Sequence, residues 1–132
     1  MILVDTSVIV AWLDRQHRDH VICRDGLVYW AGKEKLAVSS VTYAELAAGG
    51  RTQEQVDEDL LGMHRVDFDF PPAWIAGQHF MRNPVRKEKG SLVLPDYMIR
   101  AQAQHLGWKH LTNDRRRLSD FPQVDFIFPE DH

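Results

Sequence analysis

Short apolar segments of strand length alternate along the chain with longer segments of helical periodicity. The strand-length segments are residues 2–4, 36–39, 64–67, 109–111 and 124–128. The helical segments are residues 6–12, 20–33, 42–48, 52–61, 71–82 and 95–105. Strands that alternate with helices form a parallel sheet with helices on both faces. The pattern therefore predicts a three-layer α/β/α fold around a sheet of about five strands, and the 132 residues suit a single domain spanning residues 1–132.

Cysteine content and hydropathy indicate a cytoplasmic protein. Cys23 is the only cysteine, so no intramolecular disulfide can form. Residues 1–10 have no basic segment and no small-residue cleavage site, and they carry Asp5, so they indicate a buried strand and not a signal peptide. No uncharged stretch of the chain, residues 6–13 among them, is long enough to span a bilayer. We therefore expect no association with a membrane.

Proteins that hold nucleic acids by charge alone carry a positive net charge, whereas the formal net charge of this chain is −3. A role on nucleic acid would depend on local basic patches and on metal ions. One candidate patch contains Arg82, Arg86, Lys87 and Lys89, and the other is the arginine run 115–117. For each patch the sequence alone favours the simpler interpretation, a solvated surface that aids solubility.

Four carboxylates fall where predicted strands end or predicted helices begin. Asp5 directly follows the first strand, and Asp114 follows the fourth strand after two residues. Glu45 lies near the start of the helix after the second strand, and Asp96 lies at the start of the 95–105 helix. In parallel sheets the functional crevice lies beyond the carboxyl ends of the strands. We therefore expect these four side chains to converge.

Each carboxylate also has a purely structural interpretation. Asp5 suits a helix N-cap, and Glu45 would complete a capping box with Thr42. Asp96 would favour the positive end of a helix dipole, and Asp114 would stabilise a turn. Taken singly, these interpretations are the stronger ones, but they do not explain why four acids share one edge of the sheet.

A converging set of carboxylates suits phosphodiester hydrolysis. Mg²⁺ and Mn²⁺ prefer oxygen ligands, and such ions orient and activate a water and stabilise the leaving oxygen. No nucleophilic side chain is needed for this reaction. The candidate catalytic residues are Asp5, Glu45, Asp96 and Asp114.

Four motifs, in order, resemble those of the PIN-domain nucleases, and most closely those of the VapC-like toxins of bacterial toxin–antitoxin pairs. Residues 2–7, ILVDTS, are similar to the family's first strand and first acid, and residues 39–46, SSVTYAEL, to its second motif. Residues 94–99, LPDYMI, resemble the third motif and residues 111–114, LTND, the fourth, with the typical LSDFP following at 118–122. The resemblance covers nearly the whole chain.

The resemblance implies a metal-dependent ribonuclease with Mg²⁺ or Mn²⁺ as its cofactor. Asp5 and Asp96 would be the principal metal ligands, and Asp114 would complete the site or act through a water. Glu45 would position a metal-bound water or a second ion. The resemblance also implies RNA as substrate, a homodimer, and inhibition by a small antitoxin whose C-terminal segment wraps the toxin.

Other residues near the motifs have supporting roles or depart from the family pattern. By resemblance, the hydroxyls of Thr6 and Thr112 would hold carboxylates in place. Arg100 and Gln102 stand where small or Thr-like residues are usual. Tyr97 would narrow the site or stack on a base, or else pack against a neighbouring helix, which is the preferred interpretation. Asp120 is either a further acid of the site or a loop residue.

Three other functions remain open. A PIN nuclease of housekeeping RNA maturation would use the same chemistry. A catalytically silent interaction module would use the fold alone, and the complete set of four acids argues against it. A doubly wound phosphotransferase with an Asp nucleophile needs a second Asp two positions after the first, where this chain has Ser7.

Overall fold

Five parallel strands form one sheet in the order β3-β2-β1-β4-β5, in a computed structural model that describes residues 1–132. The strands are β1 (Ile2–Val4), β2 (Leu36–Ser39), β3 (His64–Val66), β4 (Lys109–Leu111) and β5 (Phe126–Ile127). Ile2 is in register with Leu36 on one side and with Lys109 on the other, so β1 is the central strand.

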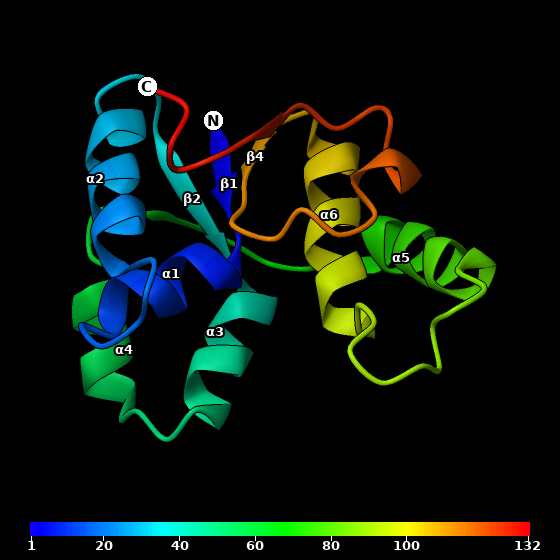
Figure 1. Cartoon of the computed structure of the whole chain (residues 1–132), viewed down its shortest axis with the longest axis horizontal. Helices are drawn as coiled ribbons and strands as arrows, with labels where there is room; N and C mark the ends of the chain where they lie inside the picture. Colours follow the sequence, from blue (N-terminus) through cyan, green and yellow to red (C-terminus); the bar gives the residue numbers. More distant parts are fainter.

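Six α-helices cover the sheet, and a short 3₁₀ helix follows β4. They are α1 (Thr6–Leu13), α2 (His20–Ala31), α3 (Ser40–Ala48), α4 (Gln53–Asp59), α5 (Phe70–Arg82), α6 (Leu94–Leu106) and the 3₁₀ helix η1 (Leu118–Asp120). Helices α1 to α4 lie on one side of the strands, and α5 and α6 lie on the other (Figure 1). The predicted three-layer α/β/α fold is therefore confirmed. None of the helices is long and apolar enough to cross a membrane.

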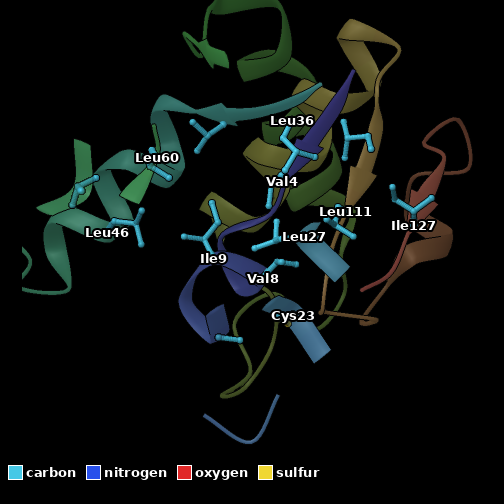
Figure 2. Close-up of a cluster of buried hydrophobic side chains, with 14 residues drawn as sticks. Val4, Val8, Ile9, Cys23, Leu27, Leu36, Leu46, Leu60, Leu111 and Ile127 are labelled. Carbon is cyan, nitrogen blue, oxygen red and sulfur yellow. The ribbon is translucent and has the colours of Figure 1, made fainter. Parts of the chain in front are cut away.

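Successive residues of β1 face opposite layers, as expected for a strand that is buried on both faces. Val4 packs with Val8 of α1 and Leu27 of α2 in one hydrophobic cluster (Figure 2). Leu3 belongs to the opposite cluster, together with Ile99 of α6. The strand thus binds the two helical layers together and fixes the position of the residue that follows it.

The path of the chain creates a switch point beside β1. From β1 the chain passes outward through β2 to β3, and α5 and α6 then return it to β4 on the other side of β1. Connections that leave adjacent strands in opposite directions open the crevice in which parallel sheets bind ligands. Asp5 N donates to Leu111 O at 2.8 Å, so the ends of β1 and β4 are held together at this point.

Most differences from the predicted elements are at their ends. Helix α3 begins at Ser40 and not at residue 42, because Ser39 caps it by accepting a hydrogen bond from Val41 N at 3.1 Å. Strand β5 is shorter than the predicted 124–128, because Val124 lies in the turn before it and donates from N to Phe121 O at 3.1 Å. The predicted end of α6 is confirmed: Gly107 has a φ of +68°, a left-handed conformation that favours glycine.

Candidate active site

The four predicted acids lie together at the carboxyl edge of the sheet. Asp5 follows β1 and Asp114 follows β4, while Glu45 lies on α3 and Asp96 lies in the first turn of α6. Burial raises the pKa of Glu45, and the charges of Asp96 and Asp5 raise it further. Burial also raises the pKa of Asp96, and the charges of Asp5 and Asp114 add to that effect. The charges of these carboxylates thus link Glu45 with Asp5 and Asp96, and Asp96 with Asp5 and Asp114, at one edge of the sheet.

Asp5 is the most deeply placed of the four and is 8 % exposed. Its Oδ2 accepts hydrogen bonds from Ser7 N (3.3 Å), Ser7 Oγ (2.5 Å) and Thr112 Oγ1 (3.1 Å). Its Oδ1 lies 3.6 Å from Nε2 of the buried His110. Burial alone would raise the pKa of Asp5, but His110, Ser7 and Arg100 outweigh it and lower the pKa to about 2. Asp5 is therefore a fixed anion at neutral pH.

Glu45 is oriented by a hydroxyl of α1. Its Oε1 accepts a hydrogen bond from Thr6 Oγ1 at 2.7 Å, and Thr6 Oγ1 lies 2.9 Å from Thr42 Oγ1. The capping box expected between Thr42 and Glu45 is wrong, because α3 begins at Ser40 and Thr42 lies inside the helix. Glu45 therefore faces the end of β1 and does not cap its own helix.

Asp96 combines a structural contact with a free oxygen. Its Oδ2 accepts a hydrogen bond from Val93 N at 2.9 Å, which is the helix-start role that its position predicted. Its Oδ1 accepts no hydrogen bond from the protein. The side chain is thus held at the crevice by one oxygen while the other remains available.

Asp114 is held by an arginine two residues further along the chain. Arg116 donates from Nε to Oδ1 (3.0 Å) and Oδ2 (3.2 Å) and from Nη2 to Oδ2 (2.6 Å). Arg116 N also donates to Oδ1 at 3.0 Å, which is the predicted turn contact. Burial raises the pKa of Asp114, but its hydrogen bonds with Arg116 outweigh burial and lower the pKa.

A buried arginine lies beside the carboxylates. Arg100 is 2 % exposed and lies on α6 one turn after Asp96. It donates from Nη1 to Arg116 O (2.6 Å) and from Nη2 to Asp114 O (3.1 Å), and Nη2 lies 4.0 Å from Asp114 Oδ1. Burial lowers the pKa of Arg100, while the charges of Asp114, Asp5 and Asp96 oppose that effect. Arg100 fixes the loop after β4 and places a positive charge among the acids.

Two residues that depart from the family pattern lie outside the crevice. Tyr97 is fully buried and packs against Phe80 of the neighbouring helix α5, with ring centroids 5.6 Å apart, so the packing interpretation is confirmed. Gln102 is 1 % exposed and donates from Nε2 to Asp67 O at 3.0 Å, just beyond the end of β3. Both residues support the elements that surround the site.

The arginine run 115–117 is not a free basic patch. Each of its members pairs with an acid: Arg115 with Glu130, Arg116 with Asp114, and Arg117 with Asp120. Arg117 donates from Nε to Asp120 Oδ2 at 2.7 Å, and Asp120 is the last residue of η1. Asp120 is therefore a loop residue and not a further acid of the site.

Four contact residues of the site were not predicted from the sequence: Ser7, Arg116, Arg100 and His110. For the first three, their spacing from an acid along the chain is a usable signal. Ser7 follows Asp5 by two residues, the spacing of a side chain that shares a helix cap. Arg116 follows Asp114 by the same interval, and Arg100 follows Asp96 by four residues, which puts both on one helix face. No local signal identifies His110, because its contact with Asp5 depends on the pairing of β1 with β4.

The donors of the crevice have the chemistry that a hard divalent cation requires. Carboxylate oxygens suit Mg²⁺ and Mn²⁺, and no cysteine faces the four acids. As the side chains are arranged here, no three His, Cys, Asp or Glu residues are close enough to hold one ion. Both oxygens of Asp114 accept hydrogen bonds from Arg116, so an ion held through Asp114 would compete with this arginine.

An open groove adjoins the carboxylates on the side of Glu45. It has a volume of about 490 Å³ and runs between α3 and the start of α6, where Ala44, Pro95 and Met98 line it together with Glu45. A molecule that reaches Glu45 from this side meets a largely apolar surface.

The comparisons with known proteins agree with the fold. Residues 2–127 match the PIN domain, whereas the curated proteins contain no match. A toxin–antitoxin complex from Klebsiella pneumoniae has a TM-score of 0.71 at 19 % identity and covers 98 % of both chains. VapBC2 from Rickettsia felis, bound to a DNA fragment from its promoter, has a TM-score of 0.69 at 20 % identity and covers 97 % of this chain and 98 % of that one.

A third similar structure is VapC20 from Mycobacterium tuberculosis, described as a toxin that cleaves the Sarcin-Ricin loop. Its TM-score is 0.68 at 15 % identity, and the match covers 95 % of this chain and 99 % of that one. At these identities the structural matches establish the fold, and the PIN domain match over residues 2–127 establishes the family. The chain belongs to the PIN domain family.

Proposed function

We propose that this protein is a Mg²⁺- or Mn²⁺-dependent ribonuclease and the toxin of a toxin–antitoxin pair. The observation that carries the proposal is the convergence of Asp5, Glu45, Asp96 and Asp114 at the switch point of the sheet. Structural capping accounts for three of the acids singly, but it does not account for Glu45, which caps nothing and faces the other carboxylates.

The proposed roles follow from the contacts of each side chain. Asp5 remains ionised and is held by Ser7 and Thr112, so it is the fixed ligand of the site. Asp96 offers its Oδ1, and Asp114 joins when Arg116 withdraws. A bound divalent ion would neutralise the phosphate and lower the pKa of a water.

Glu45 is suited to accept the proton of the attacking water. Its Oε1 is held by Thr6, so Oε2 is the oxygen that is free for this purpose. Burial and the neighbouring Asp96 and Asp5 raise the pKa of Glu45, and an acid whose pKa is raised toward the working pH is a better proton acceptor.

An exposed apolar face supports a protein partner for the toxin. On α5, Phe70 is 91 % exposed and Trp74 is 73 % exposed, and Met81 lies exposed at the end of the same helix. Exposed apolar patches of this kind mark protein interfaces. We propose a second copy of the chain and an antitoxin as its partners. We expect the antitoxin to place an Arg or Lys among the carboxylates, because an acidic cluster selects a matching cation.

Cleavage of RNA by the purified protein tests the catalytic proposal. The parent should cleave with Mg²⁺ or Mn²⁺, lose activity in EDTA, and not recover it with Zn²⁺, because the donors are hard oxygens. Asp5→Asn and Asp96→Asn should abolish cleavage while circular dichroism shows a folded protein. Asp25→Asn is the control, since Asp25 is exposed and pairs with its neighbour Arg24 on α2. Full activity in the Asp5 variant, or cleavage that survives EDTA, would contradict the assignment.

Expression in cells tests the toxin proposal. Induction of the parent should arrest growth, and sequencing of RNA ends soon after induction should show new termini. Induction of Asp5→Asn should give neither effect. Growth arrest that persists unchanged with Asp5→Asn would show that the arrest does not come from the carboxylate site.

A further inference from the structure

A positively charged segment borders the carboxylate crevice. Nine of the 16 Lys and Arg residues form ion pairs. Four of the remaining seven lie at the last residue of α5 and in the loop from α5 to α6, a stretch here called the basic segment: Arg82, Arg86, Lys87 and Lys89. Glu88 is the only acid among them, and it forms no ion pair with any of the four. The basic segment is therefore the largest group of cations on the chain that no acid neutralises.

The basic segment is attached to the crevice by Arg116. The guanidinium that holds Asp114 through Nη2 at 2.6 Å also donates from Nη1 to Gly90 O at 2.5 Å. Gly90 directly follows Lys89, so this lysine lies next to the contact. The loop then leads into the start of α6, whose first turn carries Asp96 (Figure 1). The loop that carries the cations therefore runs from the contact with Arg116, which holds Asp114, to the helix turn that carries Asp96.

Hydrogen bonds within the loop hold the basic segment in shape. Ser91 Oγ donates to Val85 O at 2.6 Å, and Val85 N donates to the side chain of Asn83 at 3.0 Å. Asn83 is 1 % exposed and anchors the beginning of the loop. Lys87 and Lys89 are exposed and form no hydrogen bond with the protein. A loop that is already ordered loses less entropy when its cations bind a ligand.

The charges of the crevice explain why such a segment is needed. An RNA strand must bring its phosphates to a site with four carboxylates, on a protein whose net charge is −3. In the metal-free protein Arg100 and Arg116 do not meet this need, because both donate to groups of the protein itself. The cations that are free to bind phosphates next to the crevice are those of the basic segment.

We propose that Lys87 and Lys89 bind backbone phosphates of the RNA strand next to the bond that is cleaved. The proposal rests on the proposed ribonuclease function and adds the surface that holds the substrate. Contacts of lysine with phosphates contribute affinity without reading bases, so the segment should act on single-stranded RNA of any sequence. The alternative is that this patch is only a solvated surface that aids solubility.

Binding of RNA without cleavage tests the proposal. The probe is a short fluorescein-labelled single-stranded RNA of mixed sequence in EDTA, and fluorescence anisotropy gives its affinity over a range of KCl concentrations. The double variant Lys87→Ala/Lys89→Ala should bind more weakly. Its plot of log K against log [KCl] should be shallower by about 1.4, because each phosphate contact in a single strand contributes about 0.7 to the slope.

The matched control is Lys33→Ala/Lys35→Ala. It removes the same two charges at the opposite edge of the sheet, where β2 begins, and should keep the slope of the parent. Thermal melts check that both variants remain folded. A parental slope in the Lys87/Lys89 variant would overturn the proposal, and so would an equal loss of slope in the control, which would reflect net charge alone.

Two further outcomes separate this proposal from others. If the Lys87/Lys89 variant binds RNA like the parent but no longer binds polyglutamate, the segment recognises acidic protein and the proposal is overturned. Cleavage in Mg²⁺ or Mn²⁺ is scored separately. A parent that binds RNA through these lysines but never cleaves it would contradict the proposed ribonuclease and still support the RNA-binding segment.

Discussion

The guanidinium of Arg116 holds both carboxylate oxygens of Asp114, with Nε 3.0 Å from Oδ1 and Nη2 2.6 Å from Oδ2. Arg116 thereby neutralises in cis one of the acids proposed as a metal ligand. The same guanidinium contacts Gly90 O, so release of Asp114 is linked to the loop that carries the basic segment. Metal binding through Asp114 therefore competes with an internal ion pair.

The first prediction follows from this competition. Arg116→Ala should bind Mn²⁺ more tightly in isothermal titration calorimetry, by roughly tenfold, which corresponds to about 1.4 kcal/mol. Because the Arg116 side chain is half exposed, loss of the ion pair should lower the metal-free free energy of unfolding by about 1 kcal/mol at most. Arg115→Ala is the control, since Arg115 pairs with Glu130 away from the acids. Equal Mn²⁺ affinity in parent and Arg116→Ala would show that this ion pair does not restrict the site.

The second prediction concerns the pH dependence of stability at Asp5. Its pKa is lowered from 3.8 to about 2, so ionisation of Asp5 stabilises the fold above the unfolded pKa and this stabilisation is lost as pH falls toward 2. The full contribution is about 2 kcal/mol at neutral pH, and about 1 kcal/mol of it disappears between pH 5 and pH 3.

Urea unfolding of the metal-free parent and of Asp5→Asn at these two pH values measures the effect. The difference in the free energy of unfolding between the two proteins should shrink by about 1 kcal/mol from pH 5 to pH 3. Asp25→Asn serves as the control, because Asp25 is an exposed residue of α2 outside the crevice. A difference that does not change with pH would mean that Asp5 is not held as a low-pKa anion.

The positions of the acids were predictable because they depend on where strands end. The strands before Asp5 and Asp114 are short apolar runs, and in a parallel sheet the residues after such runs reach the same edge. No distant contact was needed for this inference. The helices were also predictable from the local sequence, because Pro, Gly and capping residues mark their ends.

The neutralisation of the arginine run was not predictable from the sequence. Arg115 meets Glu130, which comes from the far end of the chain, and this contact exists only after β5 pairs with β4. Arg117 has a φ of +53°, a left-handed conformation that no local pattern of a non-glycine residue predicts. Whether a run of like charges in a sequence is free to bind a ligand is therefore known only once its ion-pair partners on other elements are known.

The third prediction tests the packing role of Tyr97. Tyr97→Leu should lower the free energy of unfolding by about 1–3 kcal/mol, because it removes a fully buried ring that packs on Phe80 and Phe121. It should leave the affinity for single-stranded RNA in EDTA unchanged, whereas loss of a stacked base would weaken binding by about 1–3 kcal/mol. Anisotropy at a temperature where the variant is folded decides between the two, and weakened RNA binding would restore the stacking interpretation.

The last prediction separates the two roles of Asp96. Its Oδ2 accepts a hydrogen bond from Val93 N, which stabilises the start of α6, but burial and the charges of Asp5 and Asp114 raise its pKa. An acid with a raised pKa makes the folded state less stable once the pH exceeds that pKa. Asp96→Asn keeps an oxygen acceptor for Val93 N and removes the charge. The metal-free variant should therefore be at least as stable as the parent at neutral pH, with a gain on the order of 1 kcal/mol or less.

Thermal melts in EDTA and in Mg²⁺ measure both roles of Asp96 together. The parent should gain more from Mg²⁺ than Asp96→Asn, because a ligand that binds only the folded state stabilises it in proportion to its affinity. Asp69→Asn is the matched control: Asp69 is the N-cap of α5 and makes no side-chain capping bond. Its loss of charge should cost about 0.3–1 kcal/mol through the helix dipole and leave the Mg²⁺ response intact. If Asp96→Asn behaves like this control, Asp96 stabilises only its helix, and the metal is held by other residues.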